Sequence, residues 1–423
     1  MPVSTDLATV LPKVRRRLIP FLFLLYIVSY LDRINVGFAA LQMNAALGLS
    51  ASAYGFGAGI FFLSYTLLEV PSNIVLARIG ARLWIARIMI TWGVVSSGMM
   101  LVRGADSFYA LRFLLGAAEA GFFPGIIFYL TRWFPARERA RTIAAFMTAT
   151  LVAGIVGGPV SGALLSMHGL GGLAGWQWLF LLEGLPAVVL GFVVLFYLTE
   201  RPEDARWLTD DEWTALVSAL RQDASARASA TDTVTRAFGS GRIWLLAAVY
   251  FTIPVALYAF GFWLPQIIKT ASNGSNFEIG LLTAIPYVVG AAGMVVVARH
   301  SDRTGERRWH IVGAAMVGGT AFAGSTVMHS LAGSLVALSL AMLGLASMFG
   351  PFWALATSTL GGVGAAAAIA LINSIGNTGG FAGPYLIGYI RDRTHSFTWG
   401  LIVVGAVLAF VPLLVIALRE ERV

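Results

Sequence analysis

Long apolar segments dominate this chain, and short polar segments separate them. A helix needs about 20 apolar-rich residues to cross the hydrocarbon core of a membrane. Twelve segments approach or exceed that length, which predicts an all-α polytopic membrane protein with twelve transmembrane helices. The predicted spans cover residues 18–41, 53–77, 83–103, 106–131, 142–167, 176–198, 243–268, 278–298, 309–329, 331–359, 365–390 and 397–418.

One long polar segment, residues 199–242, interrupts the series after the sixth span. Thr209 lies directly before the acidic run that starts at Asp210, which is typical of an N-cap and predicts a short surface helix. The chain is therefore expected to form a six-helix bundle over residues 1–198, a cytoplasmic linker over 199–242 and a second six-helix bundle over 243–423.

An internal repeat supports this division into two halves. Two motifs recur at the same offset of 225 residues. They are Gly154-x3-Gly158-Pro159, repeated as Gly379-x3-Gly383-Pro384, and Arg78-x-Gly80-x-Arg82, repeated as Arg303-x-Gly305-x-Arg307. Two parallel halves of six helices are how major facilitator transporters are built.

The composition excludes several other classes of protein. Of the 423 residues, 58% are hydrophobic and 12% are charged, whereas soluble domains carry about 25% charged residues. There is no cysteine, so disulfide and thiol chemistry are excluded. The sequence contains neither a nucleotide-binding Gly-Lys-Ser/Thr loop nor a His-Glu-x-x-His zinc motif. We therefore expect no enzyme and no metal site.

The distribution of lysine and arginine predicts the orientation, because cytoplasmic loops retain an excess of these residues. This rule accounts for the net charge of +8 without a nucleic-acid partner. The basic residues that gather on one side are Lys13, Arg15, Arg16, Arg17, Arg78, Arg82, Arg87, Arg132, Arg137, Arg139, Arg141, Arg299, Arg303, Arg307 and Arg308. The opposite loops hold Arg103, Lys269, Arg391 and Arg393. Both termini are therefore expected to be cytoplasmic.

Two adjacent charges, Asp32 and Arg33, lie inside the first predicted span. A charge near the bilayer centre costs roughly 2.5–3.5 kcal/mol on insertion scales, so such residues usually face a cavity, a partner or a substrate. Neighbouring residues point about 100° apart around a helix. Asp32 and Arg33 therefore cannot face the same way, and one of them is expected to engage a neighbouring helix.

The loop Ala298-Arg-His-Ser-Asp302-Arg303-Thr-Gly305-Glu-Arg307-Arg308 resembles the facilitator signature between paired helices. The acid of that signature is replaced by Ala77 in the first half. The resemblance implies a cytoplasmic conformational latch formed by Asp302, Arg303 and Arg307. The alternative is a basic loop that only sets the topology.

Four further runs carry a closer family resemblance. The run from Gly154 to Gly162 resembles the facilitator glycine–proline motif, for which helix packing is our main interpretation. The more specific runs are Tyr30–Asn35, Arg112–Gly125 and Trp176–Pro186. Nearly the whole chain resembles the anion:cation symporter family of the major facilitator superfamily, in its phthalate/tartrate/hexonate-permease-like branch.

The resemblance implies roles for four charged residues of the first half. Arg33 would bind the substrate carboxylate, while Asp32 and Glu119 would be proton-coupling acids. Arg112 would hold Glu119 or a nearby acid in the resting state. Arginine suits its role because the planar guanidinium stays charged and matches a carboxylate. The alternative for each residue is a structural ion pair.

The second half lacks charges at the equivalent positions, since Arg112 maps to Ala337 and Glu119 to Gly344. It is therefore expected to supply neutral contacts. The candidate substrate-binding residues besides Arg33 are Tyr65, Tyr258, Trp353, Asn373 and Asn377. The resemblance places Tyr65, Trp353 and Asn373 on the central cavity, and each candidate has the alternative of interhelical packing.

Two more acids, Glu69 and Glu183, lie within apolar spans and are interpreted as structural or gating residues. The 5 histidines fall at span ends or in loops, and none is placed as a proton relay.

The sequence therefore favours a proton-coupled symporter that imports a small organic carboxylate across the bacterial inner membrane by alternating access. No resident cofactor is expected, and the coupling ion is the proton, with sodium as the alternative. The expected partners are the organic anion, protons and the lipid bilayer, and the expected state is a monomer. Aromatic, sugar-derived and hydroxy-dicarboxylic acids would all fit Arg33.

Three alternatives stand beside this hypothesis. A drug/proton antiporter would share the glycine–proline motif but has less need of a fixed cation. A transporter-like ligand sensor would need an enlarged cytoplasmic surface. A membrane enzyme that uses the intramembrane acids would need a nucleophile or a metal beside them.

Overall fold

The structure is a computed structural model that describes residues 7–135, 138, 142–143, 146–228, 239–359 and 364–418. Every regular element within these ranges is a helix. Arg137, Arg139 and Arg141 of the expected basic loops lie outside the described residues.

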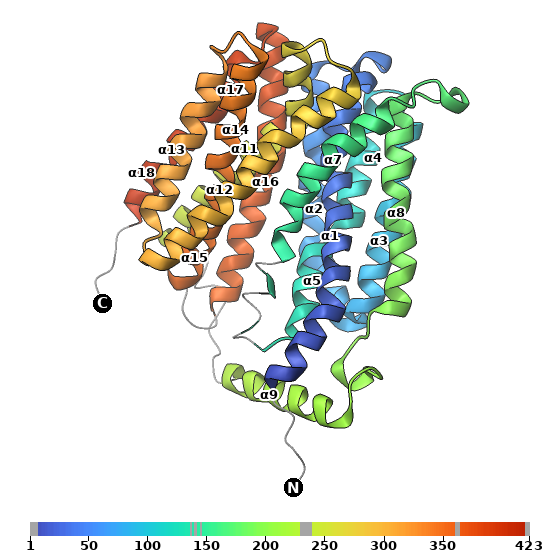
Figure 1. Cartoon of the computed structure of the whole chain (residues 1–423), viewed down its shortest axis with the longest axis vertical. Coiled ribbons are helices and arrows are strands. Elements are labelled where there is room, and N and C mark those ends of the chain that lie inside the picture. The colour runs from blue at the N-terminus through green and yellow to red at the C-terminus, as the bar shows by residue number, and fades with distance from the viewer. Residues whose placement is uncertain are drawn as a thin grey trace.

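The helices of the first part of the chain gather on one side of the molecule (Figure 1). They are α1 (Leu7–Ala46), α2 (Ala51–Ile79), α3 (Ala81–Gly98) with its extension η1 (Met99–Leu101), α4 (Ala105–Glu119), α5 (Phe122–Thr131), α7 (Ala149–Leu165) and α8 (Gly175–Tyr197). A short turn of helix, η2 (Leu170–Gly172), lies between α7 and α8.

The helices of the last part gather on the other side (Figure 1). They are α11 (Gly241–Ala271), α12 (Asn276–Thr304), α13 (Arg308–Ser325), α14 (Leu331–Ser347), α15 (Phe349–Thr359), α16 (Gly364–Thr394), α17 (Thr398–Ala409) and α18 (Val411–Ala417). The placement of the domain boundaries at residues 198 and 243 stays a prediction.

Each of the twelve predicted spans overlaps at least one of these helices. Within the described residues, 9 helical segments are long and apolar enough to cross a membrane, and α7 is a shorter apolar helix. Several boundaries differ from the prediction because helices continue past the apolar region, and two examples carry charged residues. Helix α1 begins at Leu7, well before residue 18, and α12 runs to Thr304 and includes Asp302 and Arg303.

One predicted span, 106–131, is divided at Gly121, directly after the acidic residue Glu119. Helix α4 ends at Glu119, and Gly121 has a φ of 88°, a left-handed conformation that glycine adopts without strain. Ser72 of α2 donates a hydrogen bond of 2.6 Å to the carbonyl of Ala120 and so satisfies the interrupted backbone. The break therefore positions Glu119 at the end of a helix.

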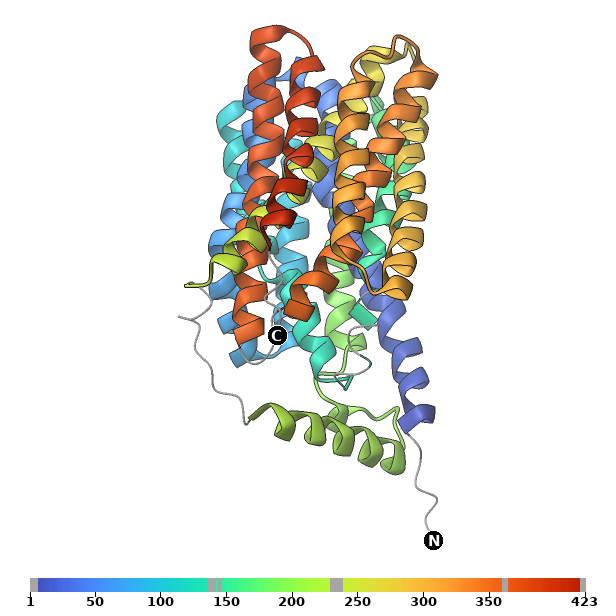
Figure 2. The ribbon, with the colours of Figure 1, turned by 90° about the vertical axis from the view of Figure 1, so that its left-hand side faces the viewer.

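Beyond the bundle, α9 (Asp210–Ala228) follows the short helix η3 (Pro202–Asp204) and lies across one end of the molecule (Figure 2). The predicted N-cap is confirmed, because the Glu212 N–H donates to the Thr209 hydroxyl and the Thr209 N–H donates to the Glu212 carboxylate. Lys13 of α1 lies 2.6 Å from Glu212, and this hydrogen bond lowers the pKa of the Glu212 carboxyl. We call this end of the molecule the α9 end.

The two groups of helices meet through glycines near the opposite end. At the contact of α7 with α12, a Cβ on Gly158 would lie 2.3 Å from the carbonyl oxygen of Gly280. At the contact of α2 with α16, a Cβ on Gly55 would lie 2.5 Å from the carbonyl oxygen of Pro384. Such small residues let membrane helices pack backbone to backbone, which agrees with the packing interpretation of the Gly154–Gly162 motif.

A polar contact also joins the two groups of helices at this end, which we call the closed end. The Asp392 carboxylate of α16 accepts hydrogen bonds from the backbone N–H groups of Ala51 at 2.9 Å and Ser52 at 2.8 Å, and also from the Ser52 hydroxyl. These donors belong to the first turn of α2, where backbone N–H groups lack helical partners and the helix dipole favours a negative charge. Asp392 therefore caps α2 from the other group of helices.

Replacing Asp392 with alanine is expected to move the conformational equilibrium toward states that open this end. Loss of hydrogen bonds to a charged group removes roughly 1–3 kcal/mol, enough for about a tenfold change in the population ratio. Because the chain has no cysteine, spin labels can be attached directly at Ala46→Cys and Asn273→Cys, two positions at the closed end. Distance measurements between the labels should show a larger population of long distances.

Asp106→Ala is the matched control, since Asp106 is an exposed carboxylate at the start of α4. The control should leave the distance distribution unchanged. Identical distributions for wild type and Asp392→Ala would show that the cap does not hold this end closed.

Candidate functional site

The centre of the candidate site is an ion pair between Arg33 of α1 and Glu119 of α4. The guanidinium Nη2 of Arg33 donates to Oε1 of Glu119, and the same oxygen accepts a hydrogen bond of 2.8 Å from Ser29. The two side chains are 11% and 1% exposed. Ser29 lies one helical turn before Arg33, a spacing that could have identified it as part of the same face.

Aromatic side chains surround the Arg33 guanidinium. Its Nη1 donates a hydrogen bond of 3.2 Å to the Tyr258 hydroxyl of α11. The rings of Phe61 and Tyr65 on α2 lie 5.3 and 5.4 Å from the guanidinium carbon, within the range of cation–π attraction. The structure therefore brings Arg33, Glu119, Tyr65 and Tyr258 together. Their roles in substrate binding and proton coupling stay predictions.

Asp32 faces away from this cluster, as the helical geometry required. Its carboxylate accepts hydrogen bonds from Trp92 Nε1 at 2.6 Å and from the Ser96 hydroxyl at 2.9 Å, both on α3. Asn35 adds a third hydrogen bond of 3.3 Å. Trp92 and Ser96 were not predicted as partners of Asp32. They lie four residues apart on one face of an apolar span, a spacing that could have indicated a shared contact. Proton coupling by Asp32 stays a prediction.

Arg112 is fully buried, and in this conformation its hydrogen bonds go to the backbone of α2 rather than to Glu119. Its role in holding Glu119 or a nearby acid in the resting state stays a prediction. Arg112 donates to the backbone carbonyls of Gly57 at 3.3 Å and Ala58 at 2.8 Å, both on α2. Its guanidinium also lies 5.1 Å from the centre of the Phe61 ring. In this conformation Arg33 supplies the cation for Glu119, and Arg112 joins α4 to α2.

Two further acids occupy different surroundings. Glu69 of α2 accepts a hydrogen bond of 3.4 Å from the Asn373 side chain of α16, so it bridges the two groups of helices. Glu183 of α8 accepts a hydrogen bond of 2.7 Å from Ser161 of α7. Asn373, a predicted substrate contact, thus lies beside Glu69, for which a structural or gating role was predicted.

The remaining predicted substrate contacts, Trp353 and Asn377, lie on α15 and α16. Trp353 of α15 packs its ring against Tyr250, with centroids 4.9 Å apart, and against Phe352 at 5.3 Å. Asn377 is partly buried on α16, one turn beyond Asn373. The structure gives both residues positions between helices, and their roles in binding stay predictions.

At the α9 end, the predicted latch forms an ion pair inside its own motif. Arg307 Nη1 lies 2.7 Å from the Asp302 carboxylate and donates a hydrogen bond of 2.8 Å to the Ser301 hydroxyl. Arg303 is exposed, and the neighbouring Arg308 donates to the carbonyl of Leu418 after α18. The role of these residues as a latch stays a prediction.

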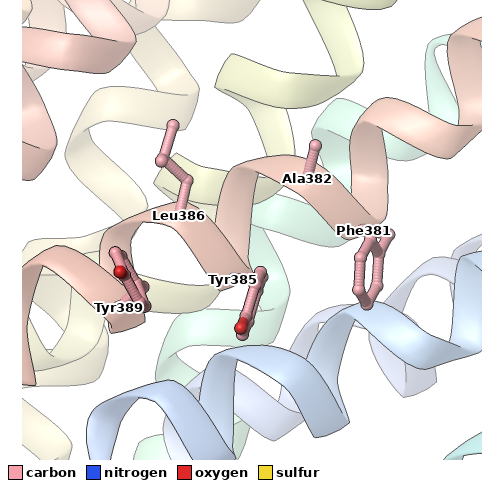
Figure 3. Close-up of a pocket in the computed structure, with 5 residues that line it drawn as sticks. All are labelled: Phe381, Ala382, Tyr385, Leu386 and Tyr389. Atoms are coloured by element: carbon pink, nitrogen blue, oxygen red, sulfur yellow. The ribbon is translucent and has the colours of Figure 1, made fainter.

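A separate cavity of about 450 Å³ runs along α16 (Figure 3). Its lining residues are Phe381, Ala382, Tyr385, Leu386 and Tyr389. The aromatic rings of Phe381 and Tyr385 also contact Phe56 of α2. Because the lining has no charged group, this cavity does not match the chemistry of a carboxylate site.

Comparison with known proteins places these features in a family. The sequence model of the Major Facilitator Superfamily matches residues 22–384. A protein of Agrobacterium vitis named putative tartrate transporter is 51% identical over 419 residues, which cover 99% of this chain and 96% of that protein. A quinolone resistance transporter of Acinetobacter baumannii is 41% identical, over 93% of this chain and 91% of its own.

The fold also matches solved structures. A bacterial homologue of the human lysosomal transporter Spinster, in an inward-facing and occupied conformation, superimposes with a TM-score of 0.80 and 15% identity. The match covers 97% of this chain and 99% of that one. With the family match and the close relatives, we conclude that this chain belongs to the major facilitator superfamily, in a branch resembling the anion:cation symporters, and is a multi-pass membrane transporter rather than an enzyme.

Proposed function

We propose that this protein is a proton-coupled symporter that imports a small organic carboxylate. The observation that carries the proposal is the buried ion pair between Arg33 and Glu119. The name of the Agrobacterium vitis relative, a putative tartrate transporter, supports a carboxylate as substrate. Membership of the transporter family supports alternating access as the mode of action.

The chemistry of the ion pair couples a proton to an anion. Arginine keeps its proton in a protein, so we assign the coupling proton to Glu119. A proton on Glu119 removes the negative partner of Arg33, and a substrate carboxylate then takes that place. The guanidinium fork can bind the substrate carboxylate with two hydrogen bonds. One proton and one carboxylate therefore occupy the site together.

The empty transporter returns by re-forming the original pair. After the substrate and the proton leave, Glu119 again neutralises Arg33. An unpaired charge buried between the helices would destabilise the moving protein by about 3–5 kcal/mol. The return step is therefore favoured only with the ion pair intact, and this requirement prevents a leak of protons without substrate.

We assign the α9 end to the cytoplasmic side and the protein to the bacterial inner membrane. Lys13 bonds to α9, and Glu200 pairs with the Arg132 side chain and accepts a hydrogen bond from the backbone N–H of Arg82. Such an excess of basic residues is typical of cytoplasmic loops. Because the glycine contacts and the Asp392 cap close the opposite end, we assign this conformation to the inward-facing side of the cycle.

A drug/proton antiporter is the second candidate, because the Acinetobacter baumannii relative is named a quinolone resistance transporter. Quinolones themselves carry a carboxylate, so this name is compatible with an arginine in the site. The two functions differ in direction, since a symporter accumulates its substrate under an inward proton gradient and an antiporter expels it.

Replacing Arg33 with alanine is expected to abolish accumulation of the carboxylate and to raise its half-saturation concentration about tenfold or more. The reason is the loss of charge-assisted hydrogen bonds, each contributing about 1.5–3 kcal/mol. Uptake should be measured in proteoliposomes under an imposed inward proton gradient. The panel holds aromatic, hexonic and dicarboxylic acids, a quinolone and a lipophilic cation.

Arg103→Ala serves as the matched control, because Arg103 is an exposed arginine between η1 and α4. It should transport like wild type. If wild type moves no acid but expels the quinolone or the cation, the antiporter replaces the symporter. Unchanged acid uptake by Arg33→Ala would remove Arg33 from the binding site.

Replacing Glu119 with glutamine is expected to separate exchange from accumulation. Glutamine resembles the protonated acid in shape and can still accept the hydrogen bond from Ser29. The variant should exchange labelled for unlabelled substrate in counterflow while losing accumulation driven by the proton gradient. A sodium gradient is tested in parallel, and accumulation that follows sodium would change the assigned coupling ion.

The matched control for this substitution is Asp106→Asn at an exposed site, which should keep both activities. If Glu119→Gln still accumulates substrate under a proton gradient, Glu119 does not carry the coupling proton.

A further inference from the structure

Glu69 is a buried acid that the coupling mechanism above does not use. Its residue is 5% exposed, and it lies on α2 one helical turn beyond Tyr65. One carboxylate oxygen, Oε1, accepts the hydrogen bond of 3.4 Å from Asn373. The other oxygen, Oε2, is buried and has no hydrogen-bond partner among the described residues.

The position of Glu69 connects it to the Arg33 site. Tyr65, one turn away on the same helix face, lies 5.4 Å from the Arg33 guanidinium. Glu69 thus lies one helical turn from the aromatic side chain that packs against Arg33. Arg33 itself has a buried Nε without a hydrogen-bond partner in the described part of the chain. An unpartnered donor and an unpartnered acceptor therefore lie near the same residue, Tyr65.

A buried polar atom without a partner costs about 1–3 kcal/mol, so the pair of free atoms favours a ligand that satisfies both. Arg33 needs an acceptor, which a carboxylate provides. Oε2 of Glu69 needs a donor, which a carboxylate cannot provide but a hydroxyl group can. A molecule that carries a carboxylate and a hydroxyl group a short distance apart would therefore satisfy both Arg33 and Glu69.

We propose that Glu69, held in place by Asn373, is a specificity-determining residue that accepts a hydrogen bond from a hydroxyl group of the substrate. The inference rests on the proposed function, because it assumes that the substrate carboxylate binds Arg33. It narrows the substrate class to hydroxylated carboxylic acids. Unsubstituted aliphatic and aromatic acids leave the Glu69 oxygen without a donor.

The unpartnered oxygen of Glu69 also acts against the wrong substrates. A hydroxyl group would donate a hydrogen bond to this oxygen, whereas an apolar group at the same place would leave it without a partner. A site built to bind a hydroxyl rejects the analogue that lacks it, because the polar group of the site is then left unpaired. Glu69 therefore acts against unhydroxylated acids as well as for hydroxylated ones.

The test uses two series of acids that differ only in the number of hydroxyl groups. Tartrate, malate and succinate share a four-carbon dicarboxylate, and glycerate, lactate and propionate share a three-carbon monocarboxylate. Each acid competes with a transported acid in counterflow, which does not need a proton gradient. Wild type should prefer the most hydroxylated member of the series that it accepts by about tenfold or more, as expected when the other members leave a buried acceptor unsatisfied.

Glu69→Met is the principal variant, since methionine has a similar length and no acceptor oxygen. It should weaken binding of the most hydroxylated acid about tenfold and leave the unhydroxylated acid unchanged or bound more tightly, because no buried acceptor is then left without a donor. Glu69→Gln should fall between wild type and Glu69→Met. A structural role for Glu69 would instead weaken all members of a series together.

Glu183→Gln is the matched control, because Glu183 is a second buried acid that bonds to Ser161 away from Arg33. Its preference within each series should equal that of wild type. If wild type exchanges acids without regard to hydroxyl number, or if Glu69→Met keeps the wild-type preference, the inference about Glu69 is wrong and the symporter proposal stands. If wild type exchanges no carboxylate at all, the symporter proposal itself fails.

Discussion

The requirement that a buried arginine always has a partner governs this structure. Arg33 is largely buried at the contact of α1 with α4 and α11, and Glu119 neutralises it. Arg112 is buried more deeply, but its partners are backbone carbonyls of α2 that move with that helix. Carbonyl partners cannot be exchanged, whereas a carboxylate partner can be protonated and replaced. Of these two arginines, only Arg33 is therefore suited to exchange one anion for another.

The internal repeat explains where this exchange is located. Tyr258 is 225 residues after Arg33, the offset of the repeated motifs, and the two side chains share a hydrogen bond. Gly37 and Phe262 have the same offset and also lie in contact. Residues related by a two-fold repeat touch each other only near the axis that relates them. The site thus lies where both halves contribute equivalent positions, with a cation from one half and a neutral phenol from the other.

Much of this fold follows from the sequence, because span length and the positions of charges are local properties. The twelve spans, the Thr209 cap and the different directions of Asp32 and Arg33 could all be predicted from span length and helical geometry. The partners of Asp32 and Arg112 could not, since Trp92, Ser96 and the carbonyls of Gly57 and Ala58 lie on other helices. The pairing of α1 with α3, and of α4 with α2, depends on tertiary packing. The resemblance to a family supplied the roles of Arg33 and Glu119, which periodicity alone did not distinguish from a structural ion pair.

The closed end and the charged site place different conditions on movement. In a membrane the helices gain no hydrophobic stabilisation from each other, so close glycine contacts and a few hydrogen bonds hold them together. At the closed end, water can replace the Asp392 hydrogen bonds to α2 once the helices separate, because both groups lie at helix ends. Opening there exposes polar groups to solvent and leaves no charge buried without a partner. The Arg33 site offers no such replacement within the apolar interior. The state of Arg33 and Glu119 therefore decides when the helices can move, and the glycine contacts make the movement possible without a large barrier.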